Sequence, residues 1–136
     1  MTTEQYLEQI RDLDAQIQDE LEEIHNLRLM IGISGGGNDG ERVQSSSDKD
    51  KVGALAVKIA DMERKVDELV DKRFKITEQI KNMPNKTSRA ILTKVYILGK
   101  NYKTVASDID VSYRHFLRLN DKALNEFQEK YLKVVI

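Results

Sequence analysis

A heptad repeat of apolar residues constrains the fold of this chain more than any other feature. The repeat begins near Tyr6 in alternating steps of three and four residues, stops at Gly32, and resumes from Val52 to Met83. Apolar residues at this spacing form one stripe along a helix, and the stripe has to be buried against another helix. We therefore expect two helices of roughly thirty residues each, folded back as an antiparallel coiled-coil hairpin.

The segment between the two repeats, residues 32–47, lacks any helical period. It contains five glycines and a run of three serines, which supply flexible backbone. We expect a solvated loop, with Asp48 as the N-cap of the second helix. A phosphate-binding loop is disfavoured because these glycines follow a helical repeat and not a strand.

Several apolar residues lie beside the repeat and widen its apolar face: Leu21, Leu29, Val70 and Phe74. This excess predicts a further partner. A second copy, giving a four-helix bundle, is favoured over the C-terminal domain folding back on the hairpin. Arg73 interrupts the repeat, and we expect it to specify the register by pairing with an acid of the facing helix, in preference to binding a partner.

Pro84 divides the chain into two predicted domains, residues 1–83 and residues 84–136. A proline lacks a donor and excludes its predecessor from helical geometry, so a hinge is expected at residues 82–85. The second domain should hold three helices. The first is expected to be capped by Thr87 or Ser88, to run to about Leu98, and to close at Gly99 in a left-handed conformation.

The remaining two helices form a predicted helix-turn-helix, Tyr102–Ile109 and a helix from the cap Ser112. The gap between them, Asp110 and Val111, is too small for anything but a tight turn. Ala106 is small where the helices must approach. The last helix is expected to extend through Phe127 and Tyr131. The spacing of residues in the helix-turn-helix places one set inward: Val105, Ile109, Val111, Phe116 and Leu119. It places another set outward: Lys103, Tyr113, Arg114, His115 and Arg118.

The net charge of −1 conceals an asymmetry between the two parts of the chain. Residues 1–83 contain 12 Lys and Arg against 18 Asp and Glu, whereas residues 84–136 contain 10 against 5. A basic domain is what affinity for a phosphate backbone requires. The asymmetry therefore favours double-stranded DNA as the ligand of the predicted helix-turn-helix.

Catalytic and metal-binding constellations are missing from the sequence. The chain has no cysteine and two histidines, and His25 is expected on a solvated helix face. We expect no enzymatic activity, no cofactor and no metal. Neither a membrane span nor a signal peptide is evident, so we expect a soluble, unprocessed protein of the cytoplasm.

The outward side chains of the helix-turn-helix divide into two predicted roles. Arginine can bind guanine bidentately, and tyrosine and histidine can also reach base edges, so four residues are expected to contact bases: Tyr113, Arg114, His115 and Arg118. Five others are expected to contact phosphates: Lys100, Lys103, Thr104, Ser112 and Lys122. The alternative is an ordinary solvated helix face.

The C-terminal part resembles the fourth conserved region of bacterial sigma factors and related phage regulators. The matching residues are Gly99, Tyr102-Lys103-Thr104-Val105-Ala106, Val111-Ser112 and Lys122-Ala123-Leu124. Thr104 stands where the pattern commonly has an acid, and Asp110 where glycine is usual. Asp tolerates the left-handed conformation better than most residues, so the turn is expected to be retained.

The whole chain, from YLEQIRDLDAQIQDELEEI through ERVQSSSDKDK to the sigma-like end, is similar to a family of small uncharacterised proteins from phages and prophages of Gram-positive bacteria. That family borders on the phage late-transcription and autolysin regulators. The resemblance implies transcriptional control of phage genes inside a host bacterial cell.

Taken together, these patterns predict an all-α protein, in which a long antiparallel coiled-coil hairpin precedes a small three-helix helix-turn-helix domain. The first functional hypothesis is a dimeric transcriptional regulator that binds double-stranded DNA. The second is a sigma-like module that also contacts host RNA polymerase. The third is a coiled-coil adaptor in which the helix-turn-helix serves only for packing.

Overall fold

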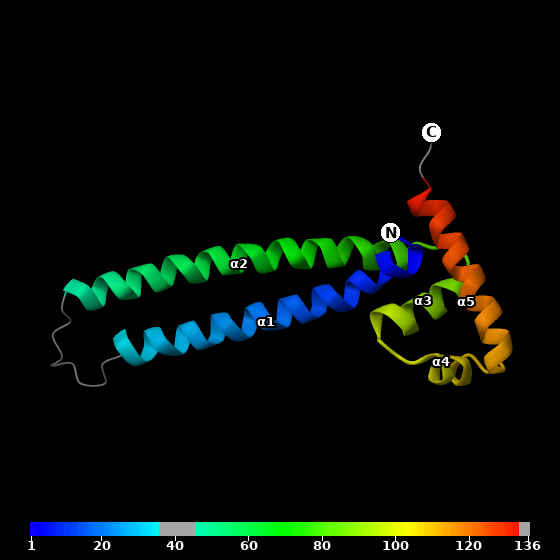
Figure 1. Ribbon diagram of the computed structural model, residues 1–136, viewed down its shortest axis with the longest axis horizontal. Helices are drawn as coiled ribbons and strands as arrows, with labels where there is room; N and C mark the ends of the chain where they lie inside the picture. Colours follow the sequence, from blue (N-terminus) through cyan, green and yellow to red (C-terminus); the bar gives the residue numbers. More distant parts are fainter. Residues whose placement is uncertain (36–45, 134–136) are drawn as a thin grey trace. The chain divides into compact units, whose positions relative to one another are not determined.

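The computed structural model describes residues 1–35 and 46–133, and it confirms the all-α class over these residues (Figure 1). Five α-helices and two π-helical segments make up this part of the chain. In order they are α1 (Thr3–Gly35), α2 (Ser46–Lys81), α3 (Lys86–Leu92), η1 (Thr93–Ile97), α4 (Tyr102–Asp108), α5 (Tyr113–Phe127) and η2 (Gln128–Leu132). The segment η1 continues α3, and η2 continues α5, so the last helical stretch extends past Tyr131 as expected. No helix in the two described ranges is long and apolar enough to cross a membrane.

The chain divides into two compact units, residues 15–71 and residues 1–14 together with 72–136. The predicted partition into residues 1–83 and 84–136 is a different one, and it stays a prediction. Each unit contains part of α1 and part of α2, and each has its own buried residues.

In the unit of residues 15–71, apolar side chains at heptad positions form the core. Ile24, Leu27 and Ile59 are buried, and Ile31, Leu55, Met62 and Val66 pack against them. Burying one such aliphatic side chain contributes about 1.5–3 kcal/mol to the free energy of unfolding. The heptad repeat thus supplies the contacts that join these parts of α1 and α2.

Ion pairs flank this core and show that the two helices run antiparallel. Glu20 accepts a hydrogen bond from Lys65 at 3.1 Å, and Arg28 pairs with Glu63. The order along α2 is therefore the reverse of the order along α1. Pairs as exposed as Arg28 and Glu63 contribute about 0–1 kcal/mol, so the apolar contacts dominate.

In the unit of residues 1–14 and 72–136, Arg73 pairs with Asp14 on the facing helix. The expected pairing of Arg73 with an acid is therefore confirmed. The Nε of Arg73 donates the hydrogen bond, and the Arg73 side chain is 31% exposed, so the ion pair is only partly buried. Its proposed function as a register specifier stays a prediction.

The beginning of α1 packs against the end of α5 in the same unit. The rings of Tyr6 and Phe127 lie 5.8 Å apart, and the Tyr6 hydroxyl donates a hydrogen bond to Gln79 at 2.6 Å. Burial raises the pKa of Tyr6, and the hydrogen bond to Gln79 opposes this effect. The C-terminal helices thus contact α1 at Tyr6. Two of the apolar residues beside the heptad repeat, Leu21 and Val70, are each 44% exposed.

The limits of the predicted loop are wrong at both ends. α1 continues through Gly35 and α2 begins at Ser46, so Asp48 lies inside a helix and is not its N-cap. Glycine costs only about 1 kcal/mol in a helix interior, which a long paired helix tolerates. Residues 36–45 of the predicted loop lie outside the described residues.

The helical path breaks between Asn82 and Asn85, as Pro84 predicts. Asn85, and not Thr87 or Ser88, is the N-cap of α3, because its side chain accepts hydrogen bonds from the backbone amides of those two residues at 3.0 and 3.3 Å. Asparagine is among the best N-cap residues, and the extended conformation of Asn85 suits that position.

The end of this helical stretch follows the prediction more closely. The π-helical turn η1 extends α3 to Ile97, and the backbone amide of Leu98 donates to the carbonyl of Thr93 at 2.9 Å. Gly99 then adopts a φ of 68°, the left-handed conformation expected of it.

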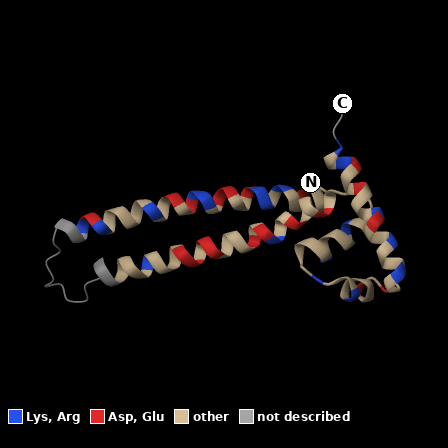
Figure 2. Ribbon diagram, in the orientation of Figure 1, with Lys and Arg blue, Asp and Glu red and all other residues tan. Residues whose placement is uncertain are grey.

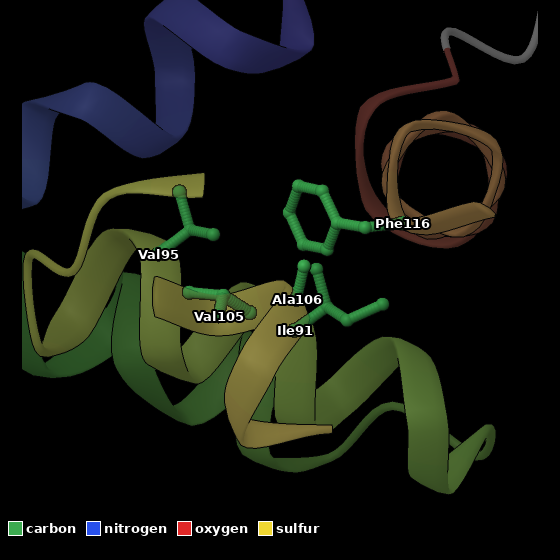
Figure 3. Packing of buried hydrophobic residues seen from close by; sticks show 5 residues of the cluster. All are labelled: Ile91, Val95, Val105, Ala106 and Phe116. Carbon is green, nitrogen blue, oxygen red and sulfur yellow. The ribbon is translucent and has the colours of Figure 1, made fainter. Parts of the chain in front are cut away.

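A second buried cluster holds α3, η1, α4 and α5 together (Figure 3). It consists of Ile91, Val95, Val105, Ala106 and Phe116, against which Tyr96, Tyr102, Ile109, Val111 and Leu119 pack. In Figure 3 the ring of Phe116 points from α5 toward Ile91 and Ala106. The five residues expected to point inward are thus all buried or packed against this cluster.

Replacing Phe116 with alanine should lower the free energy of unfolding by about 3–5 kcal/mol, because the side chain is fully buried and leaves a cavity. Urea denaturation followed by circular dichroism measures this change. Arg114→Ala is the matched control, since an exposed neighbour in α5 should change stability by about 0.5 kcal/mol or less. Equal losses in the two variants would contradict the described packing.

Candidate nucleic-acid interface

The turn between α4 and α5 is built from two backbone hydrogen bonds that close the end of α4. The amide of Val111 donates to the carbonyl of Ala106 at 3.0 Å, and the amide of Asp110 donates to Ser107 at 3.1 Å. This pattern is a Schellman motif, which requires a left-handed residue, and Asp110 has a φ of 62°. The expectation that Asp110 adopts the left-handed conformation and retains the turn is confirmed.

Ser112 begins α5 as its N-cap, as predicted. Its hydroxyl oxygen accepts a hydrogen bond from the backbone amide of His115 at 3.1 Å. Asn101 caps α4 in the same way, accepting from the amide of Thr104 at 2.8 Å. The two caps and the Schellman turn determine where each helix starts and therefore which side chains its first turns expose.

The first two turns of α5 bring the four predicted base-contacting residues together on its exposed side. Arg114, His115 and Arg118 are exposed, and Tyr113 is 45% exposed. The Tyr113 ring stacks on Phe116 with centroids 6.5 Å apart, so Tyr113 lies where the exposed face meets the core. The candidate interface is thus a short surface with two arginines, bordered by an aromatic ring. The Lys and Arg residues of α5 are blue in Figure 2.

Leu117 belongs to the same exposed surface and was not among the predicted residues. It is 38% exposed, one turn after Tyr113. A leucine in an amphipathic helix is expected to be buried, so its residue type offered no reason to place it outside. Its position between Tyr113 and Asp121 along one side of the helix is the signal that could have identified it.

The predicted phosphate contacts lie in different settings. Lys103 and Thr104 are exposed on the first turn of α4, Ser112 is exposed at the turn, and Lys122 is exposed on α5. Lys100 differs from them because its ammonium group lies 2.8 Å from the carboxylate of Asp108. Four of the five groups are therefore available to an anion on the surface.

Asp108 is the centre of a small charge cluster next to α4. Its carboxylate accepts a hydrogen bond from Lys100, and Lys94 lies 3.6 Å away. The hydrogen bond from Lys100 holds the pKa of Asp108 below its usual range, with the charges of Lys100 and Lys94 acting in the same direction. Because the pKa is lowered, the pair is intact at neutral pH and is lost only as the pH falls through that lowered value.

A model of a protein family matches residues 35–128, which is more than half of the chain. The chain belongs to the DUF1492 family. This family is described as proteins of unknown function, and the match includes α2, α3, α4 and all of α5. No curated protein and no solved structure matches the chain. The expected membership in a family of uncharacterised proteins is thus confirmed, and α4, the turn and α5 lie within the residues that the family model matches.

If this DUF1492 protein binds double-stranded DNA, as the sequence predicts, Asp108→Asn should increase the affinity, because Lys100 and Lys94 lose their carboxylate partner. The plot of log affinity against log salt concentration should steepen by about 0.9 for each lysine that gains a phosphate. Fluorescence anisotropy with a labelled duplex at several salt concentrations measures both effects.

Asp121→Asn is the matched control for this change. It removes the same charge from an exposed position of α5, and the structure of residues 1–35 and 46–133 gives Asp121 no ion pair. The salt slope should therefore stay unchanged in Asp121→Asn. A steeper slope in both variants would show that the ion pair does not restrain Lys100.

Proposed function

We propose that this DUF1492 protein is a phage-type transcriptional regulator that binds double-stranded DNA through α4, the Asp110 turn and α5, as a sigma region-4-like helix-turn-helix. The observation that carries the proposal is the exposed surface of Arg114, Arg118 and His115, with its two arginine charges, at the start of a capped helix. In helix-turn-helix proteins the first residues of the second helix contact base edges in the major groove.

The dimensions of α5 support this proposal. Its 15 residues give a length of about 22 Å at 1.5 Å per residue, and the major groove is about 12 Å wide and admits one α-helix. Phe116, Ala123 and Phe127 are fully buried on the opposite side of α5. The buried side joins α5 to the rest of its unit and leaves the side with Arg114 and Arg118 open to a groove.

Electrostatics supports the same ligand. Residues 84–136 carry 10 Lys and Arg against 5 Asp and Glu. Lys103 and Thr104 at the start of α4, Ser112 at the turn and Lys122 on α5 can contact phosphates on either side of the groove. In this proposal the phosphate contacts position the protein, and Arg114, Arg118, Tyr113 and His115 read the sequence.

Arg114→Ala should weaken binding to a selected duplex by about 1–3 kcal/mol if Arg114 binds a guanine bidentately, and should affect a random duplex less. Lys103→Ala is the comparison, since loss of a phosphate contact weakens binding to every duplex alike. The measurement is an electrophoretic mobility shift with a duplex recovered by selection from a random pool. Equal losses of Arg114→Ala on selected and random duplexes would exclude direct readout by Arg114.

Two alternative functions would use the same surfaces, and co-purification and DNA-binding experiments distinguish them from the proposed one. A sigma-like module would co-purify with RNA polymerase, as the resemblance of Gly99 and Tyr102–Ala106 to sigma region 4 suggests. A coiled-coil adaptor would retard no duplex even at low salt. The exposed apolar residues of the hairpin helices favour a protein partner of some kind, and Leu29 and Met30 are each 51% exposed.

We assign that partner to a second copy of the chain, with the coiled-coil hairpin as the dimerisation element. The apolar residues beside the heptad repeat support this assignment, because Leu21 and Val70 are each 44% exposed and Phe74 is 62% exposed. Surfaces of this kind are commonly covered in oligomers. A symmetric dimer would also present two copies of α5 to a palindromic site.

Light scattering after size exclusion should therefore give twice the mass of one chain at micromolar concentration. Val70→Glu should shift the population to the monomer, because the new charge would have to be buried in the dimer. Asp71→Lys is the control, since it changes charge at an adjacent exposed position that lies outside the apolar stripe. A wild-type protein of single-chain mass would contradict the dimer.

A further inference from the structure

Leu117 is a large aliphatic side chain on the surface of α5, next to Arg118 in the sequence and one turn after Arg114. It is 38% exposed, whereas Phe116 before it is fully buried. Single exposed leucines are common on protein surfaces and mean little by themselves. The position of Leu117 is informative because Arg114 and Arg118, the two arginines of the cationic surface, lie on the same two turns.

Helical geometry places Leu117 at one edge of that surface. Successive residues are rotated by about 100°, so Leu117 lies about 60° from Arg114 and about 100° from Arg118 around the helix axis. His115 lies on the far side of Arg118. From one edge to the other, the exposed surface thus presents an aliphatic group, two guanidinium groups and an imidazole.

Helical spacing places an aromatic residue next to Leu117 on the surface of α5. Tyr113 precedes it by one turn on the same side of α5, and the Tyr113 ring is held against Phe116 at 6.5 Å. Residues four apart in a helix are neighbours, so this ring lies next to Leu117. Tyr113 and Leu117 are therefore neighbours on one side of α5.

The major groove contains one apolar group, the C5-methyl of thymine, and aliphatic side chains recognise it by contact. Arg114 and Arg118 favour a polyanion over an apolar protein surface next to Leu117. On this basis, and resting on the proposed function, we propose that Leu117 is a specificity-determining residue that contacts a thymine methyl next to a base pair read by Arg114 or Arg118.

The test replaces thymine with deoxyuridine, which lacks only the C5-methyl. A duplex recovered by selection with the full chain is synthesised with each thymine replaced in turn, and affinity is measured by fluorescence anisotropy. The wild-type protein should bind about fourfold more weakly at one or two positions, the effect of one methyl group no longer removed from water. Leu117→Ala should bind the thymine and deoxyuridine duplexes equally.

Leu98→Ala is the matched control, because Leu98 is exposed in the same unit but lies outside α5. It should retain the wild-type discrimination, and circular dichroism of both variants checks that the helices are intact. If the wild-type protein binds the selected duplex but shows no discrimination at any thymine, this inference is wrong and DNA binding stands.

Three other results of these experiments would each lead to a different conclusion. A Leu117→Ala variant that still discriminates thymine from deoxyuridine would overturn the assignment to Leu117. A variant that binds both duplexes like the wild type but loses co-purification with RNA polymerase would assign Leu117 to a protein partner. Failure of the wild-type protein to bind any duplex would overturn the proposed function, and this inference with it.

Discussion

Burial of Phe116 between α5 and the helices α3 and α4 is the interaction on which the rest of the candidate interface depends. The ring joins Ile91 and Ala106 in one cluster (Figure 3). Once Phe116 points inward, the helical period places Arg114 and Arg118 on the exposed side. The Schellman turn at Asp110 then determines the direction in which α5 leaves α4. The apolar core and the exposed cationic surface are therefore two consequences of the same packing.

The positions of the charged residues in residues 84–136 matter more than their net charge. Residues 84–136 are basic by count, but Asp108 engages Lys100 and Lys94 in one cluster. Arg114, Arg118 and Lys122 on α5 and Lys103 at the start of α4 stay exposed to solvent. Part of the basic charge thus stabilises the local structure, and the remainder is available to an anion.

The sequence predicted the local features well and the helix limits less well. The all-α class, the left-handed residues Gly99 and Asp110, and the cap Ser112 are confirmed, because each follows from interactions within one turn. The caps Asp48 and Thr87 or Ser88 are wrong, since a glycine-containing helix can continue when it is paired and Asn85 competes better for the position after Pro84. The roles of the candidate DNA-contacting residues are still predictions.

By itself, then, the sequence determined the helical periods, the turn and the side of α5 that carries arginine. Only the tertiary structure decided that Lys100 is paired, that Leu117 is exposed, and that the first residues of α1 pack on the end of α5 through Tyr6 and Phe127. The physical reason is the distance along the sequence over which each interaction acts. Capping and periodicity depend on a few neighbouring residues, whereas burial and ion pairing depend on side chains that the fold brings together from distant positions.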